Sequence, residues 1–468
     1  MNLNQVRVLA IIAFASIQLQ AFSQYNYYFG TIHAHSGYSD GNKDSLTSFM
    51  SMPYEDFEYA KHSLHMDYLG ISEHNHSGAG MQLANYHRGV RQADSANQEG
   101  SFVSLYGMEW GEIASGGHVV VYGFDSLIGW ETNNYDIFNA QTDYTGLFAK
   151  IAHHSGAFGY FAHPTNSDYN AIYTSPYNAV SDSAIIGTPF RSGPAFSTDT
   201  LYSDPSTGNY LTRFYDALKA GYHLGIGMDH DTHYSVFGRS QKGRTVVLAD
   251  TLTRSAILDA YRSMRFYASD DWNAQISFTA NGHTMGQIIT EAGSPNLSIS
   301  VIDPDGESNS SITIFYGIPG SGVAPTALTS VSSSLSLNYT PAIANGTSYY
   351  YFARILQADG DQIYTSPIWY TRSDFVAVPQ LALPAIQYFT ITPNPSNGEF
   401  MYSFTTSVRL NLMLDVYTAE GKQVYHHPVP PTNGMYAEQV QLPTLAKGIY
   451  LIRLSGEGLQ QMQKMIIE

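Results

Sequence analysis

Five short apolar runs in the first half of the chain each end in a cluster of histidine and acidic residues. Such runs predict buried strands. When polar residues follow the carboxyl ends of several such strands, the fold can bring those residues together at one end of a barrel. The runs and the residues after them are 27–32 with His33, His35 and Asp40; 69–72 with Glu73 and His74; 105–108 with Glu109; 159–162 with His163; and 224–228 with Asp229, Asp231 and His233.

The segment from residue 25 to 271 alternates these runs with longer mixed stretches that have helical spacing. In residues 252–265, for example, Ile257, Leu258, Tyr261 and Met264 recur every three or four positions. Alternating strands and helices predict an α/β domain with a mostly parallel sheet or barrel.

The pattern of apolar runs and turn residues changes near Trp272. Residues 273–374 contain short apolar runs separated by turn clusters such as Asn281-Gly282 and Asp359-Gly360, which predict an all-β sandwich. Residues 375–388 contain two prolines in a mostly apolar stretch and are interpreted as a linker. Residues 389–468 are expected to form a second small all-β module.

Composition excludes several classes of function. The net charge of -17, from 22 basic and 39 acidic residues, argues against a nucleic-acid partner, which would require a basic surface. The chain has no cysteine, so disulfides, a thiolate nucleophile and a zinc finger are excluded. Its 17 histidines remain available as metal ligands.

The amino-terminal residues predict export. Arg7 precedes an apolar run over residues 8–15, and small residues at Ala21 and Ser23 fit a signal-peptidase site after Ser23. Gln18 and Gln20 interrupt the run, which is shorter than the ~20 apolar residues of a spanning helix. We therefore expect a signal peptide at residues 1–23 and no integral membrane segment.

The clustered residue types favour divalent cations. Residues two apart on a strand point the same way, so His33 and His35 can bind one ion. Imidazole and carboxylate ligands together suit zinc, manganese or iron, and Glu109 could bridge two ions. Each motif alone also has a structural explanation without a metal. An HxH pair can lie on the protein surface, and Asp40-Gly41 can form a turn. Fivefold repetition favours the metal site, although His118 departs from the pattern by preceding its apolar run.

The motifs as a set resemble those of the PHP (polymerase and histidinol phosphatase) superfamily, closest to its secreted carbaryl-hydrolase-like metallohydrolases. The resemblance covers residues 27–290 and implies a distorted (βα)7 barrel that holds two to three divalent ions. It is carried in order by Gly30-Thr31-Ile32-His33-Ala34-His35, Ser39-Asp40-Gly41, Ile71-Ser72-Glu73-His74-Asn75, Gly107-Met108-Glu109-Trp110, Gly117-His118, Ala162-His163-Pro164 and Asp231-Thr232-His233.

Carried over position by position, the resemblance implies nine metal ligands, with Asp231 also taking a proton from the attacking water. The implied sets are His33, His35, Glu109 and Asp231 for one ion; Glu109, His118 and His163 for a second; and Asp40, His74 and His233 for a third. Arg244 matches a recurring segment and could clamp a substrate oxyanion or form a surface salt bridge. The family usually has Asp where this chain has Glu73, so the role of Glu73 stays open.

Two further resemblances concern the rest of the chain. Residues 273–371 are similar to the β-sandwich that accompanies this branch of the superfamily. Residues 389–468 resemble a type IX secretion C-terminal sorting domain, through Pro393-Asn394-Pro395, Ala419-Glu420-Gly421-Lys422 and Lys447-Gly448-Ile449-Tyr450. The type IX machinery is therefore an expected partner, and the expected location is the cell surface or the medium.

Together these features predict a secreted hydrolase in which a metal-activated hydroxide attacks a small-molecule or polymer-derived phosphoester. Two alternatives stay open. The same site could hydrolyse carbamates, esters or amides, because a carbonyl is open to the same attack. The protein could also be a surface binding protein whose ions only brace the fold.

Overall fold

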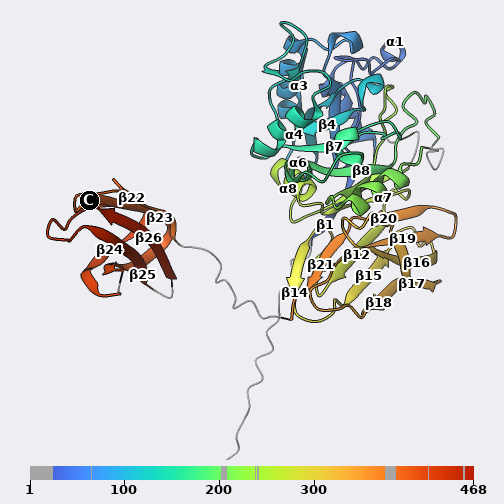
Figure 1. Ribbon diagram of the computed structural model, residues 1–468. Coiled ribbons are helices and arrows are strands. Elements are labelled where there is room, and N and C mark those ends of the chain that lie inside the picture. Colours follow the sequence, from blue (N-terminus) through green and yellow to red (C-terminus); the bar gives the residue numbers. More distant parts are fainter. Residues whose placement is uncertain are drawn as a thin grey trace, which may run out of the picture. The chain divides into compact units, whose positions relative to one another are not determined.

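The computed structural model describes residues 25–64, 66–201, 208–237, 239, 242–374, 386–419, 421–456 and 459–468. The signal peptide predicted for residues 1–23 lies outside the described residues, as does most of the linker predicted for residues 375–388. The chain divides into two compact units, Met1–Asp374 and Phe375–Glu468 (Figure 1).

The amino-terminal part of the first unit is a mixed sheet with helices in its connections. Its long parallel strands follow each other in two groups, β1–β2–β3 and β7–β8–β9. The strands are β1 (Asn26–Thr31), β2 (Tyr68–His74), β3 (Val103–Trp110), β4 (Val119–Tyr122), β7 (Phe158–Phe161), β8 (Ile185–Arg191), β9 (Gly225–Met228), β10 (Arg244–Ala249) and β11 (Phe266–Ser269), with a separate small pair β5 (Ile128–Gly129) and β6 (Ile137–Phe138).

Helices occupy most of the connections in this part of the chain (Figure 1). The segment 252–265 contains the predicted helix, whose Thr253 side chain caps the first turn by accepting from the Ala256 N–H at 3.2 Å. The helices are α1 (Ser45–Ser48), α2 (Pro53–Ser63), α3 (Leu83–Ala96), α4 (Tyr144–His153), α5 (Asn170–Tyr173), α6 (Ala179–Ala184), α7 (Leu211–Ala220) and α8 (Arg254–Arg262), with single 3-10 turns η1 (Ser77–Ala79) and η2 (Ile113–Ser115).

The remainder of the first unit is built from strands alone. Burial in β12 alternates strictly along the strand, as expected for a strand with one face on a core. The strands are β12 (Gln275–Ala280), β13 (His283–Thr284), β14 (Ile288–Glu291), β15 (Leu297–Ile302), β16 (Asn309–Gly317), β17 (Thr326–Ser332), β18 (Ser336–Tyr339), β19 (Ser348–Gln357), β20 (Gln362–Thr365) and β21 (Ile368–Arg372).

The (βα)7 barrel expected from the family resemblance is wrong. The main sheet is mixed and runs in the order β14-β21-β19-β20-β11-β10-β1-β2-β3-β4-β7-β8-β9, with β16 and β17 paired beside β19. A separate sheet has the order β13-β12-β15-β18, and no (βα)7 barrel is evident in the described residues. β4 is antiparallel to both neighbours, β10 is antiparallel to β1 and β11, and β11 is antiparallel to β20. Apolar runs locate strands but carry no signal for strand direction, so the sequence pattern could not distinguish this mixed sheet from a parallel barrel.

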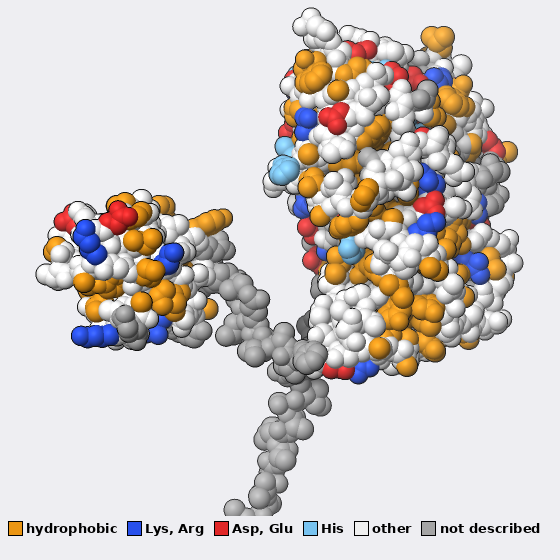
Figure 2. All heavy atoms as spheres, viewed as in Figure 1, with side chains coloured by type: hydrophobic (Ala, Val, Ile, Leu, Met, Phe, Trp, Pro, Cys, Tyr) orange, Lys and Arg blue, Asp and Glu red, His pale blue; other side chains and the backbone are white. Residues whose placement is uncertain are grey.

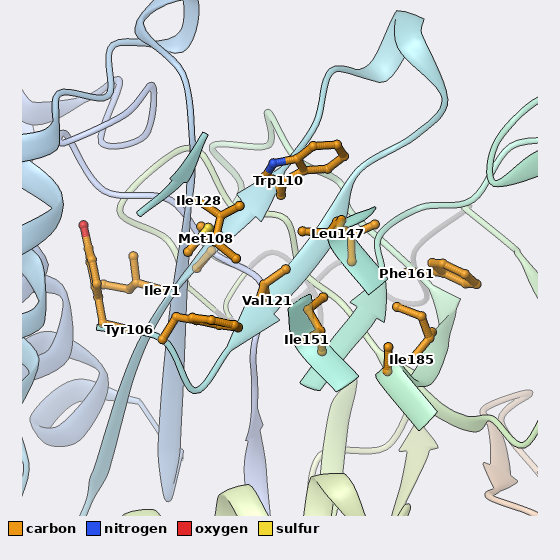
Figure 3. Packing of buried hydrophobic residues seen from close by; sticks show 14 of the residues in the cluster. Ile71, Tyr106, Met108, Trp110, Val121, Ile128, Leu147, Ile151, Phe161 and Ile185 are labelled. Carbon is orange, nitrogen blue, oxygen red and sulfur yellow. The ribbon is translucent and has the colours of Figure 1, made fainter. Parts of the chain in front are cut away.

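A large apolar core packs α4 against the β4–β7 part of the sheet. Leu147 and Ile151 lie one turn apart on α4 and point among Val121, Phe161 and Ile185 (Figure 3). Leu147 is fully buried. This spacing of four residues puts both side chains on the helix face that covers the sheet.

We predict that Leu147→Ala lowers the free energy of unfolding by about 2–5 kcal/mol, because the lost methyl groups leave a cavity in this core. Chemical denaturation followed by circular dichroism would measure the change. The control is Thr145→Ala on the exposed face of the same helix, expected to stay within about 0.5 kcal/mol of the unmodified protein. Equal effects of the two substitutions would contradict the packing described here.

The described residues of the second unit form a five-stranded antiparallel sheet with its own apolar core. Buried Asp415 anchors one face by accepting from the Arg453 guanidinium at 2.7 Å. Its strands are β22 (Ile386–Thr392), β23 (Glu399–Thr418), β24 (Gln423–Gln441), β25 (Gly448–Gly456) and β26 (Leu459–Ile467). Across both units, none of the helices described has the length and apolar character needed to cross a membrane.

Candidate metal centre

The candidate ligands come from separate strand ends that meet at one edge of the mixed sheet. His33 and His35 follow β1, His74 ends β2 and His163 follows β7, while Glu109 lies near the end of β3. Because β1, β2 and β3 are parallel, their carboxyl ends face the same edge, and His74 is the direct cross-strand neighbour of Glu109. Asp231 and His233 follow β9 and complete the group.

The direction of β4 explains why His118 departs from the sequence pattern. β4 runs antiparallel to β3, so its amino end lies beside the carboxyl end of β3. A ligand on this strand must therefore precede the apolar run. The His118 carbonyl accepts from the Ala162 N–H at 3.1 Å, which places His118 next to the segment that carries His163.

Backbone hydrogen bonds fix the segments around β1 and β9 side by side. The His35 N–H donates to the Thr232 carbonyl at 3.0 Å, and the Asp231 N–H donates to the His33 carbonyl at 2.9 Å. Asp231 has φ 50° and His163 has φ 29°, conformations that side-chain-bearing residues adopt infrequently. Uncommon backbone conformations at two candidate ligands are typical of functional sites.

The nine predicted ligands all fall into three overlapping groups, within each of which the ligand atoms lie within 4.8 Å of one another. Glu109 and His74 each belong to two groups. The groups are His33, Glu109, His163 and Asp231; His74, Glu109 and His118; and His35, Asp40, His74 and His233. Their membership differs from the sets implied by the family resemblance, since His163 joins His33 and His35 joins Asp40.

Glu109 occupies the middle of the centre and faces imidazoles with both of its oxygens. Oε1 lies 2.8 Å from His118 Nδ1, 3.0 Å from His163 Nε2 and 3.2 Å from His33 Nε2. Oε2 lies 3.2 Å from both His35 Nε2 and His74 Nδ1. A fully buried carboxylate with this arrangement has the geometry of a bridging ligand.

Asp231 and Asp40 provide the other carboxylates. Asp231 Oδ1 lies 3.1 Å from His35 Nε2 and 3.3 Å from His33 Nε2. Asp40 Oδ1 lies 3.3 Å from His233 Nε2 and 3.5 Å from His74 Nε2. The Oδ1 atom of each of these two carboxylates therefore faces two imidazole nitrogens.

These separations and the unpaired atoms fit divalent cations. Two ligand atoms that each lie ~2.1 Å from one ion are roughly 3.0–3.4 Å apart at octahedral or tetrahedral angles. Several of the converging atoms are buried without a hydrogen-bond partner among the described residues, which is costly unless another group satisfies them. They are His33 Nε2, His74 Nδ1, His118 Nδ1, Glu109 Oε2 and Asp40 Oδ1.

The electrostatics of the centre favour negative charge on Glu109 and positive charge on His33. Burial opposes the charge on Glu109, but the imidazoles of His118, His33 and His74 outweigh it and hold the pKa of Glu109 well below its ordinary value. Burial also opposes charge on His33, yet the Glu109 and Asp231 carboxylates raise its pKa well above the ordinary value. Because cations compete with protons for these nitrogens, metal loading is expected to release protons.

The two carboxylates of residues 229–231 have different positions. Asp229 is fully buried, and its Oδ2 lies 3.1 Å from His33 Nδ1, the nitrogen that faces away from Glu109. This contact would orient the His33 ring and fix which nitrogen is free to bind an ion. Asp231 reaches the other side of the same ring, at Nε2. Asp229 therefore orients the candidate ligand His33, whereas Asp231 is itself a candidate ligand.

Glu73, whose role the sequence left open, anchors the loop that carries Asp40. Its carboxylate accepts hydrogen bonds from the Ser36 and Ser39 hydroxyls and from the Ser36 N–H. Burial raises the pKa of Glu73 despite these donors. Glu73 holds the residue 36–39 part of the loop, so it positions Asp40 through the loop backbone. The sequence signal for a role of Glu73 at the centre was its place directly before the candidate ligand His74.

Arg244, the other candidate catalytic residue, begins β10. Since β10 is antiparallel to β1, its amino end lies at the same edge as the ligands. Arg244 is 1% exposed and donates to the Lys242 and Gly243 carbonyls at 2.6 and 2.9 Å. Contact with a substrate oxyanion and a salt bridge both stay predictions for this side chain.

Aromatic side chains that the motifs did not indicate flank the centre. The Phe196 ring, 64% exposed, lies 4.7 Å from the His233 ring. On another side His76 stacks on Trp130 with centroids 5.6 Å apart. Among the ligand side chains, Asp40 at 32% and Asp231 at 14% are more exposed than Glu109 at 0%, so solvent reaches the centre from the side of these carboxylates.

Residues 390–468 match the family described as the secretion system C-terminal sorting domain. The match occupies most of the second unit. It indicates secretion through the type IX system to the cell surface or the extracellular space, which confirms the location predicted from the sequence.

Comparison with curated proteins finds no match for the chain. Among solved structures, similarity is found to Clostridium thermocellum CbhA fibronectin(III)-like modules, with 14% identity, 42% of this chain and 94% of that chain covered, and a TM-score of 0.16. Similarity to a Streptomyces avermitilis α-L-rhamnosidase has 13% identity, 41% and 24% coverage, and a TM-score of 0.17. With TM-scores this low, the description of the fold depends on the sheet topology alone.

We predict that the secreted protein lacks residues 1–23 and the tail from about Phe389, because signal peptides and sorting domains are removed during export. Intact-mass measurement of protein recovered from the surface or medium of the native host would test both ends. Secreted protein that still ends at Glu468 would contradict removal of the sorting domain.

Proposed function

We propose that the protein is a secreted, metal-dependent hydrolase of phosphate esters, related to the PHP metallohydrolases by its motifs. The observation that carries the proposal is the central position of Glu109, with imidazoles on both oxygens and nine ligand side chains in three overlapping groups. Several adjacent ions would suit a substrate that carries more than one anionic oxygen.

The acidic character of the chain fits this proposal only if cations line the site. The net charge is -17, and on the face of the first unit seen in Figure 2 basic side chains stand singly among acidic and apolar ones. An anionic substrate would therefore be attracted by bound ions, which can reverse the local field.

When bound, the ions would activate water and neutralise charge that develops on the phosphoryl oxygens. The residues of the chain have separate tasks in this scheme. Asp231, at the solvent side of the centre, is positioned to accept a proton from the attacking water. Asp229 holds the ring of His33, and buried Arg244 would supply a fixed positive charge at the same sheet edge.

The test is turnover of matched nitrophenyl phosphates, carbamates and carboxylic esters by protein loaded in turn with zinc, manganese or iron. Phosphate turnover at least tenfold above the other two classes is expected. A preference for carbamates or esters would assign carbonyl chemistry to the same centre. Loaded protein that is inert on the whole panel would favour a binding protein braced by ions.

Asp40→Asn provides an internal check on the panel. This carboxylate belongs to a single group of ligands, so its substitution should weaken one ion while leaving the other two groups intact. Activity that follows the loss of that ion would link turnover to the centre. Activity unchanged in Asp40→Asn and in Asp231→Asn would show that the measured turnover comes from a contaminant.

A further inference from the structure

Tyr169 contacts the backbone beside two candidate ligands, His118 and His163, although no sequence motif indicated it. It directly precedes α5 and is 1% exposed. Its hydroxyl lies between two carbonyl oxygens and can donate to either, that of His118 and, at 2.9 Å, that of Ala162. Since Ala162 directly precedes His163, one phenol contacts the segments that carry both ligands.

The surroundings of Tyr169 hold its side chain in this position. The ring stacks on Phe161 with centroids 3.9 Å apart, and the Tyr169 N–H donates to the Gly116 carbonyl at 2.9 Å. A Cβ atom at Gly117 would come within 2.8 Å of the Tyr169 ring, so any side chain at this position would displace the phenol. The approach of the phenol thus gives a physical reason for glycine directly before His118.

The two ligands that the phenol connects belong to different groups, and Glu109 is common to both groups. Both imidazoles also face the same oxygen of this carboxylate. Glu109 Oε1 lies 2.8 Å from His118 Nδ1 and 3.0 Å from His163 Nε2. The spacing of the two ligand segments therefore affects both groups at once.

We propose that Tyr169 is a positioning residue that holds His118 and His163 at the spacing needed to bind two ions around Glu109. This role rests on the metal centre of the proposed function, but it does not depend on which bond is hydrolysed. Loss of an outer hydrogen-bond partner typically lowers metal affinity ~10–100-fold. We expect the lower end of this range for two ions, because the hydroxyl acts on both ligands through their backbone.

Zinc competition with a chromophoric chelator tests the role in the full chain without a substrate. Tyr169→Phe, which removes only the hydroxyl, should release two zinc ions at roughly tenfold lower chelator concentration than the unmodified protein. The ion that faces Asp40 and His233 should be retained. The control is Tyr86→Phe, which removes a buried hydroxyl that donates to the Phe124 carbonyl at 3.0 Å, and it should retain all ions.

Cobalt substitution gives a readout that a general loss of stability would not change. In cobalt-loaded protein, Tyr169→Phe should shift the ligand-field absorption bands, because altered ligand spacing changes the coordination geometry. Tyr86→Phe should leave the bands unchanged.

Two results would overturn the positioning role. One is a Tyr169→Phe variant with the chelator sensitivity and cobalt spectrum of the unmodified protein, even if the protein is an active hydrolase. The other is an equal loss of zinc from Tyr169→Phe and Tyr86→Phe, which would assign the effect to the loss of any buried hydroxyl. Zinc loss specific to Tyr169→Phe, in protein that turns over no substrate, would support the positioning role and refute the hydrolase alone.

Discussion

Asp231→Asn is expected to lower turnover by roughly a thousandfold or more, whereas Asp229→Asn should cost ~10–100-fold. The reason is geometric. Asp231 Oδ1 lies within 3.3 Å of Nε2 of both His33 and His35, so its loss removes a candidate ligand and the proposed proton acceptor together. Asp229 contacts the far nitrogen of the His33 ring, so its loss would loosen the orientation of one ligand.

Activity and bound metal should be measured for both variants under identical loading, with circular dichroism to show that each is folded. The pair is well matched, since both changes replace a carboxylate by its amide within three residues. If Asp229→Asn is the inactive enzyme and Asp231→Asn keeps most of its activity, the assignment of this motif is two residues out of register.

Glu109→Gln should have the largest effect on metal content. We predict two to three divalent ions per chain for native, unstripped protein and fewer than one for this variant. The carboxylate faces imidazoles on both oxygens, so an amide, which has one acceptor oxygen and no charge, cannot serve two groups of ligands. Elemental analysis by plasma mass spectrometry would count the ions.

A suitable control is Glu131→Gln, which makes the same chemical change at a residue that binds Ser77 and belongs to none of the ligand groups. It should retain the full complement of ions. Native protein that holds fewer than one equivalent, and gains none on addition of zinc, manganese or iron, would refute the metal centre itself.

The sequence predicted the members of the centre better than the fold that assembles them. His33, Glu109 and His163 could be singled out because each lies beside a buried apolar run, and the structure brings all nine predicted residues together. The barrel was wrong because strand direction depends on long-range pairing. The position of His118 before its apolar run was a sign of an antiparallel strand, because a ligand at the amino end of a strand meets the other ligands only if that strand runs antiparallel to its neighbour.

Other parts of the centre could not be predicted because they depend on contacts between distant residues. Phe196 reaches His233 from a loop without any motif, and only the folded chain shows the two rings together.

The pairing of β11 with β20 makes the change of pattern near Trp272 a poor place to cut the chain. Tyr267, Ala268 and Ser269 are hydrogen-bonded to residues 363–365. The Ser366 hydroxyl also accepts from the Ile226 N–H in β9, the strand that leads to Asp231. A fragment ending at Asp271 would leave β11 as a naked edge, open to aggregation, and would loosen a strand beneath the centre. Residues 273–374 therefore cannot be removed without exposing β11, and any exchange of this segment would have to preserve the pairing of β11 with β20.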